Sequence, residues 1–125
     1  MRKEIILVRD LVNRLNNKDE EFFDFFHTIH SVIAENENVL LVCDDEYDAP
    51  DEIDGYTYRL EYGVLKQICD NLNMQISNPT LDDYIEAINY YIENDAFIDK
   101  ENPYNKPQGG YKIWGMAGTS DKTDI

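Results

Sequence analysis

The sequence predicts an α+β domain in which about four helices pack with a small antiparallel sheet. Apolar residues recur at helical spacing in four segments, whereas two shorter segments are rich in apolar, β-branched or aromatic residues. The length of 125 residues fits one domain, and a hydrophobic fraction of 42% is typical of globular proteins. We therefore expect residues 1–125 to form a single acidic domain that ends in a loop-rich segment, 99–125.

Two helices are expected in the first third of the chain. The first, over residues 5–15, has an apolar stripe made of Ile5, Val8, Val12 and Leu15. Asn17 is a good N-cap residue, and Glu20 follows it in the capping-box position. A second helix is therefore expected from Lys18 to Ala34.

Two strands are expected in the middle of the chain. Val39–Cys43 is a short continuous apolar run, as in a buried strand, and Tyr56–Tyr62 alternates in a pattern that suits a strand. Asp54-Gly55 marks a turn before the second run. We expect the two strands to pair as an antiparallel hairpin, with Tyr111–Trp114 as a possible edge strand near the C-terminus.

Two further helices complete the expected domain. Apolar spacing indicates a short helix over residues 65–72 and a longer one from Pro79 to Asn94. Pro79 suits a first helical turn, and the carboxylates of Asp82 and Asp83 complement the positive end of the helix dipole.

The net charge of -15 is concentrated in one part of the chain. Residues 19–58 contain thirteen acidic side chains and no lysine or arginine. Such a field repels nucleic acids and anionic membranes and attracts a cationic protein. We therefore expect a basic protein as partner, with neither a nucleic acid nor a membrane as ligand.

We expect no secretory leader, because only four consecutive apolar residues precede Arg9. No apolar run approaches the roughly 20 residues that span a membrane. The two cysteines, Cys43 and Cys69, form no CxxC motif and fit a reducing compartment. These features predict a cytoplasmic protein.

The acidic connection between the two expected strands is the main candidate binding site. It does not match an EF-hand, because placing Gly55 sixth puts Pro50 first, where an acid is needed. A solvated loop and nonspecific divalent-cation binding are the alternatives, but Tyr47 lies among the acids, as an aromatic anchor does at an interface. The expected partner-binding residues are Asp44, Asp45, Glu46, Tyr47, Asp48, Asp51, Glu52, Asp54, Tyr56 and Tyr58.

No catalytic constellation is evident. His27 and His30 are expected three apart on one helix face, where they lack a third zinc ligand and serve as ordinary boundary residues. Cys43 and Cys69 are expected to be buried, unreactive thiols. The glycines near the C-terminus form no phosphate-binding motif. We therefore expect no enzyme activity, no metal and no cofactor.

The order of strand, acidic loop, strand and two helices over residues 40–99 resembles a family of small acidic bacterial proteins. The resemblance is sharpest at Glu93-Asn94-Asp95-Ala96-Phe97. Some members of that family are encoded beside toxins of contact-dependent growth inhibition or other polymorphic toxin systems. The resemblance implies an immunity protein that binds and neutralises a cognate toxin domain, often a basic nuclease.

An alternative is an acidic DNA mimic that inhibits a nucleic-acid-binding enzyme. A mimic needs carboxylates spaced along a face at phosphate-like intervals. In this sequence the acids are instead clustered in a loop and two expected helices, which favours the immunity protein.

Overall fold

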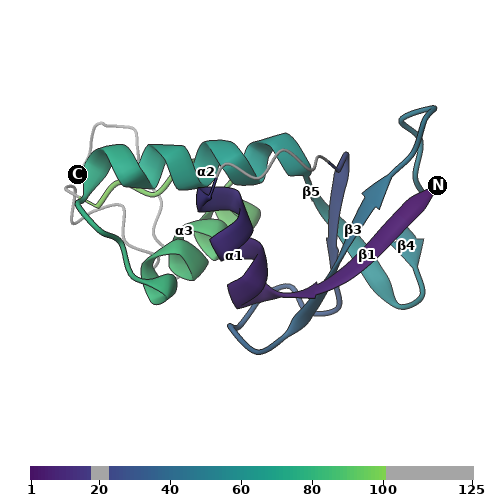
Figure 1. The fold of residues 1–125 in the computed structure, drawn as a ribbon, viewed down its shortest axis with the longest axis horizontal. Helices are drawn as coiled ribbons and strands as arrows, with labels where there is room; N and C mark the ends of the chain where they lie inside the picture. Colours follow the sequence, from purple (N-terminus) through teal and green to yellow (C-terminus); the bar gives the residue numbers. More distant parts are fainter. Residues whose placement is uncertain (18–22, 101–125) are drawn as a thin grey trace.

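Eight helices and strands occupy the part of the chain described by the computed structural model, residues 1–17 and 23–100. In chain order they are β1 (Arg2–Leu7), α1 (Val8–Asn16), β2 (Phe25–Thr28), β3 (Asn38–Cys43), β4 (Glu52–Ile53), β5 (Tyr56–Glu61), α2 (Tyr62–Gln75) and α3 (Leu81–Asn94). The helices gather at one end of the long axis and the sheet at the other (Figure 1). The α+β class is confirmed, although the described residues form three helices where about four were expected.

All five strands belong to one antiparallel sheet with the order β1-β3-β2-β5-β4. Both predicted strands exist, as β3 and β5. The hairpin predicted between them is wrong, because β2 lies between β3 and β5 and pairs with both. β5 forms its hairpin with the two-residue strand β4 instead.

The helix predicted over residues 18–34 is wrong for residues 23–34, while residues 18–22 lie outside the described part. Residues Phe25–Thr28 form β2, and all four are buried. Phe26 faces the helices, whereas Phe25 packs against Val42 on the opposite face of the sheet. A strand covered on both faces has no alternation of apolar and polar residues. The apolar residues of this segment therefore also matched helical spacing, although no helix forms there.

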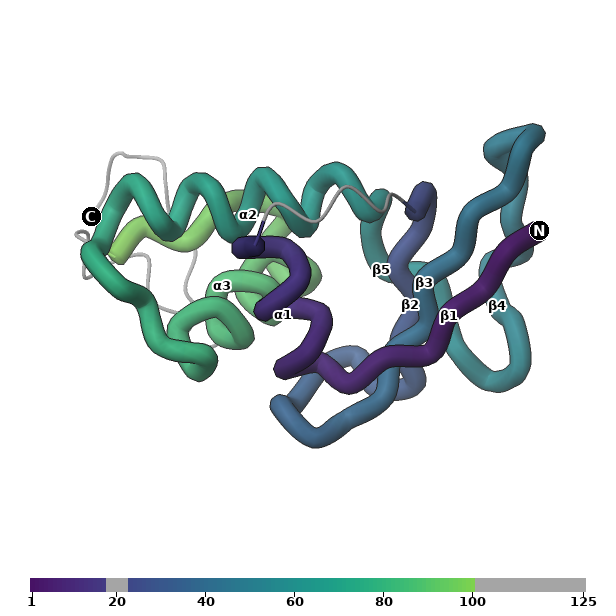
Figure 2. Tube along the Cα trace, viewed as in Figure 1, coloured from purple at the N-terminus to yellow at the C-terminus, as the bar shows by residue number. Residues whose placement is uncertain are grey.

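The helix predicted over residues 5–15 is wrong in its first part. β1 runs to Leu7, and α1 begins at Val8 with no intervening loop. β5 passes into α2 in the same way between Glu61 and Tyr62 (Figure 2). In both places the last strand residue keeps extended backbone angles and serves as the N-cap of the helix, without a side-chain capping bond.

The two later helices are confirmed with shifted bounds. α2 is longer than the predicted 65–72, and α3 begins two residues after Pro79. Thr80 is the N-cap of α3, and its hydroxyl and the Asp83 carboxylate form a reciprocal capping box. Pro79 therefore precedes the cap and is not part of the first turn.

The sheet separates two hydrophobic cores. Along β3, Val39 and Leu41 face the helices, whereas Leu40 and Val42 face the other side. The second core is covered by the connection from β3 to β5, which contributes Ile53 and the partly buried Ala49. The acidic connection thus packs on the sheet and is not a freely solvated loop.

Beyond α3 the chain returns along α2. The Gln75 amide donates to the Ile98 carbonyl at 2.7 Å and accepts from the Lys100 N–H at 2.8 Å. The predicted strand Tyr111–Trp114 and nearly all of the predicted loop-rich segment lie outside the described residues. None of the helices within the described ranges has the length and apolar character needed to cross a membrane.

Candidate partner-binding surface

The acidic connection, residues 44–54, is fixed to the sheet at its beginning by hydrogen bonds. The Asp44 N–H donates to the Asp24 carboxylate at 2.9 Å, just before β2. The carboxylate of Asp44 accepts from the Glu46 N–H at 3.2 Å, and its carbonyl accepts from the Tyr47 N–H at 2.8 Å. Asp44 therefore shapes a turn, and it is the one half-buried carboxylate among the expected binding residues.

The end of the connection is fixed in a similar way. The Pro50 carbonyl lies 3.2 Å from Nε2 of His27, and the Tyr58 N–H donates to the Asp51 carbonyl at 2.8 Å. Asp54 and Gly55 both have positive φ, 53° and 87°, and join β4 to β5 as a two-residue turn. The turn predicted at Asp54-Gly55 is confirmed.

Most of the expected binding residues lie on the surface. Tyr56 is the exception: it is only 8% exposed and packs in the second core, so its ring is not presented to a partner. The exposed residues of the set are Asp45, Glu46, Tyr47, Asp48, Asp51, Glu52, Asp54 and Tyr58.

The negative charge of this surface is hardly compensated. Lys3 pairs with Asp54 at 3.3 Å in an exposed salt bridge. None of the other ion pairs found among the described residues involves the acidic connection. The carboxylates there that form no salt bridge with residues 1–17 or 23–100 are those of Asp44, Asp45, Glu46, Asp48, Asp51 and Glu52.

Two tyrosines of the surface lie against the buried ring of Phe25. The Tyr47 and Phe25 centroids are 4.8 Å apart with the rings tilted by 42°, and Tyr58 meets Phe25 edge-on at 5.8 Å. Interaction with Glu61 is the main reason why the pKa of Tyr47 is raised. Phe25 and Glu61 were missed from the sequence, because finding them requires the pairing of β2 with β5.

His27 is buried beneath this surface and contacts the Pro50 carbonyl and the ring of Tyr58. The prediction that it lies on a helix face with His30 is wrong, because His27 is a fully buried residue of β2 and His30 is exposed after the strand. Burial lowers the pKa of His27 from its usual 6.5, while the Pro50 carbonyl and Asp51 oppose that shift. Since a carbonyl only accepts, the neutral ring carries its hydrogen on Nε2. Within the described ranges, the buried Nδ1 has no partner.

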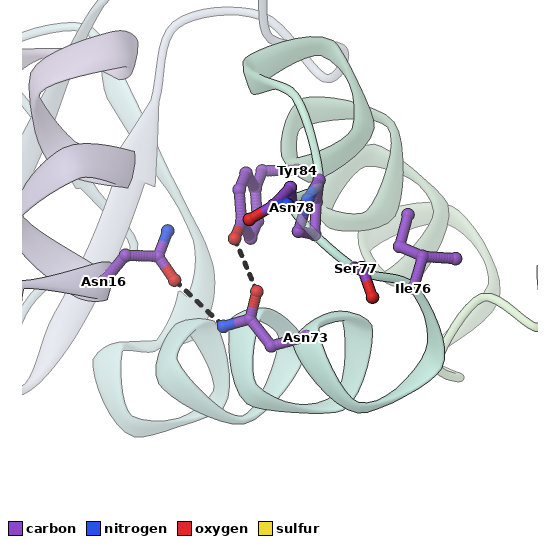
Figure 3. Close-up of a pocket in the computed structure, with 7 residues that line it drawn as sticks. Asn16, Asn73, Ile76, Ser77, Asn78 and Tyr84 are labelled. Atoms are coloured by element: carbon purple, nitrogen blue, oxygen red, sulfur yellow. Dashed lines mark hydrogen bonds between the residues drawn. The ribbon is translucent and has the colours of Figure 1, made fainter.

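A shallow pocket of about 600 Å³ lies at the helical end of the molecule and was not anticipated from the sequence (Figure 3). Its central side chain is Asn73, whose amide donates to Asn16 at 3.1 Å and accepts from the Tyr84 hydroxyl at 2.5 Å. The lining residues are Asn16, Asn73, Ile76, Ser77, Asn78, Pro79 and Tyr84. This set contains no carboxylate, histidine, cysteine or cation for acid–base or nucleophilic chemistry.

A family model described as a domain of unknown function, DUF7716, matches residues 10–100. The chain belongs to this family. Comparisons with curated proteins and with solved structures gave no match.

The DUF7716 region contains the acidic connection together with Asp24, Phe25, His27 and Glu61, which lie against it. Cys69 also lies in it, buried in the main core, where burial raises the pKa of its thiol to about 12. Cys43 is half-buried, so its predicted burial is only partial, and both thiols are free. No group of three or more His, Cys, Asp or Glu side chains suited to a metal ion occurs among the described residues.

Proposed function

We propose that this protein is a cytoplasmic, non-enzymatic immunity protein that binds and neutralises a basic toxin domain of a contact-dependent or other polymorphic toxin system. The observation that carries the proposal is the acidic connection itself. It presents exposed carboxylates, without salt bridges to the part of the chain that the structure describes, around the exposed Tyr47 ring. Such a surface fits a positively charged protein face with an aromatic anchor at its centre.

The fixed shape of the connection supports a role in tight binding. Asp24, Asp44 and His27 hold its backbone at both ends, and Ile53 is buried beneath it. A loop ordered before association loses little conformational entropy when the partner arrives. Affinity then depends on the contacts made and is not reduced by folding of the loop.

The charge supports rapid capture of a basic toxin. Nuclease active sites are basic because they hold phosphates, and complementary charge raises association rates at low salt. The two free thiols fit the reducing cytoplasm, where a toxin with an intracellular target must be blocked.

The decisive experiment is co-expression with the adjacent gene, which the proposal expects to encode the toxin. A stoichiometric complex that copurifies, together with restored growth of the host, is the expected result. For an immunity protein, duplex DNA should compete with it for the toxin only at the toxin active site. Competition by duplex DNA over the whole DNA-binding surface of an enzyme would instead support the DNA mimic. If the correct neighbouring toxin neither copurifies with this protein nor is neutralised by it, the proposal is overturned.

The double charge reversal Asp45→Lys with Asp48→Lys tests the surface directly. Both side chains are exposed and make no salt bridge to any described residue, so folding should change little. Association with the toxin should slow by at least about tenfold at low salt, as measured by stopped-flow or surface plasmon resonance.

The matched control is Asp70→Lys with Glu93→Lys, which changes the net charge equally on exposed positions of α2 and α3. It should retain nearly the wild-type association rate apart from a general charge effect. Equal slowing by both variants would mean that net charge, and not this surface, governs capture. Asp44 is unsuitable for the test because its carboxylate shapes the turn.

A further inference from the structure

Tyr47 and Tyr58 form one exposed aromatic surface although they come from different segments. Their side chains are 54% and 37% exposed, yet both rings contact Phe25, which is 8% exposed. Tyr58 also meets the buried ring of His27 edge-on at 5.8 Å. Each exposed ring therefore has a buried ring against it that limits its movement.

The backbone at Tyr47 is held in an unfavourable conformation. Its φ of 52° lies in the left-handed region, which residues with a Cβ rarely adopt. The turn around Asp44 holds it there through the Asp44 carbonyl and the Tyr47 N–H. This conformation brings the ring of Tyr47 onto Phe25, and strain of this kind is concentrated at functional sites.

A carboxylate lies beside these rings. Glu61 stands opposite Phe25 in the register of β5 and β2, and it is the largest cause of the raised pKa of Tyr47. Its charge, with that of Asp51, also raises the pKa of Tyr58, although burial is the larger cause. Across the described ranges, no lysine or arginine forms a salt bridge with either carboxylate.

We infer that Tyr47, Tyr58 and Glu61 together bind an arginine side chain of the basic partner. This inference rests on the proposed function and identifies the contact at the centre of that interface. A guanidinium is planar, stacks on aromatic rings and donates two parallel hydrogen bonds to a carboxylate. A lysine ammonium is more strongly hydrated and lacks that flat fork, so it fits two rings and a carboxylate less well.

The site can be tested without knowing the partner. The probes are two ten-residue peptides of equal charge, one alternating Arg and Gly and the other alternating Lys and Gly. In NMR titrations of the full chain at 0.05 M NaCl, the arginine peptide should shift the ring signals of both tyrosines. It should bind about three- to tenfold more tightly than the lysine peptide. Equal affinities would overturn the inference.

Substitutions locate the preference within the surface. Tyr58→Leu should abolish the preference for arginine, whereas Tyr58→Phe keeps the ring and should retain it. Tyr91→Leu is the matched control, since Tyr91 also contacts another aromatic ring, that of the exposed Phe97 at 5.4 Å, but lies on α3. Loss of the preference in Tyr91→Leu as well would contradict the assignment.

The inference and the proposed function can fail separately. If the neighbouring toxin copurifies and growth is rescued equally by wild type and by Tyr47→Leu with Tyr58→Leu, the arginine site is overturned while the immunity role stands. If the arginine preference is present but no neighbouring toxin is bound or neutralised, the site stands and the immunity role is overturned.

Discussion

At the scale of single residues, His27 shows how burial changes what a side chain does. Its Nε2 contacts the Pro50 carbonyl, and its buried Nδ1 has no hydrogen-bond partner among the described residues. A neutral imidazole ring tolerates this arrangement, because the acceptor Nδ1 is then the one ring nitrogen left without a hydrogen bond. A protonated ring would place a second donor, and a positive charge, in the same buried position.

This environment predicts acid sensitivity. Because burial lowers the pKa of His27 in the folded protein, the unfolded chain, with its ordinary value of 6.5, takes up the proton first. The stability that the neutral ring provides is therefore complete above about pH 6.5 and decreases as the pH falls below it. The charge of Asp51 and the ring of Tyr58, which face the imidazole, reduce this effect without reversing it.

The measurement compares wild type with His27→Phe, which keeps an aromatic ring but cannot titrate. At pH 7.5 the variant should be less stable in urea by about 1 kcal/mol, because the Pro50 carbonyl loses its hydrogen bond. At pH 5.5 this difference should shrink, since only the wild type loses the histidine contribution. A constant difference at both pH values would contradict the assigned direction of the pKa shift.

At the scale of elements, the sequence identified the helices after residue 60 better than the strands before it. α3 has a regular apolar stripe and an acidic first turn, and both signals arise locally. β1 and β2 depend on pairing with β3, which no local pattern encodes. Ile5 and Val8 lie at helical spacing, but the strand ends between them because β1 pairs with β3 only as far as Leu7.

One contact between distant elements is predicted to matter for stability. The Asn89 amide on α3 accepts from the Ile33 N–H at 2.8 Å and donates to the Ile33 carbonyl at 3.0 Å. Asn89→Leu should leave both backbone groups unpaired and lower the free energy of unfolding by about 2 kcal/mol. Asn13→Leu, at an exposed position of α1, is the control and should remain within about 0.5 kcal/mol of wild type. Equal unfolding midpoints for the two variants in urea would show that the Asn89 contact contributes little.

At the scale of the whole molecule, the candidate surface could be located from the sequence but its support could not. The run of acids and Tyr47 marked the connection, because charge and composition are visible in sequence. Phe25, His27 and Glu61 became part of the surface only when β2 was placed next to β5. The acidic connection extends from the sheet end of the molecule, away from the helices (Figure 1).

The net charge of -15 predicts that salt affects folding and binding in opposite directions. Raising NaCl from 0.01 to 1 M shortens the Debye length from about 30 to about 3 Å and screens repulsion among the acids. The urea midpoint should therefore rise with salt. Salt also screens the salt bridges among the described residues, but these are exposed or half-buried and contribute little to stability. The salt used in this measurement should be a chloride, because sulfate also stabilises proteins through exclusion from their surface.

Binding of a basic partner should weaken over the same range of salt, because its attraction to the acidic connection is screened. The variant with Asp45→Lys and Asp48→Lys separates the two effects. Each substitution makes the net charge less negative by two units, so the pair brings it from -15 to -11. Its urea midpoint should rise less with salt than that of wild type, and its residual binding should depend less on salt. A wild-type midpoint that falls as NaCl increases would mean that salt bridges outweigh repulsion in this fold.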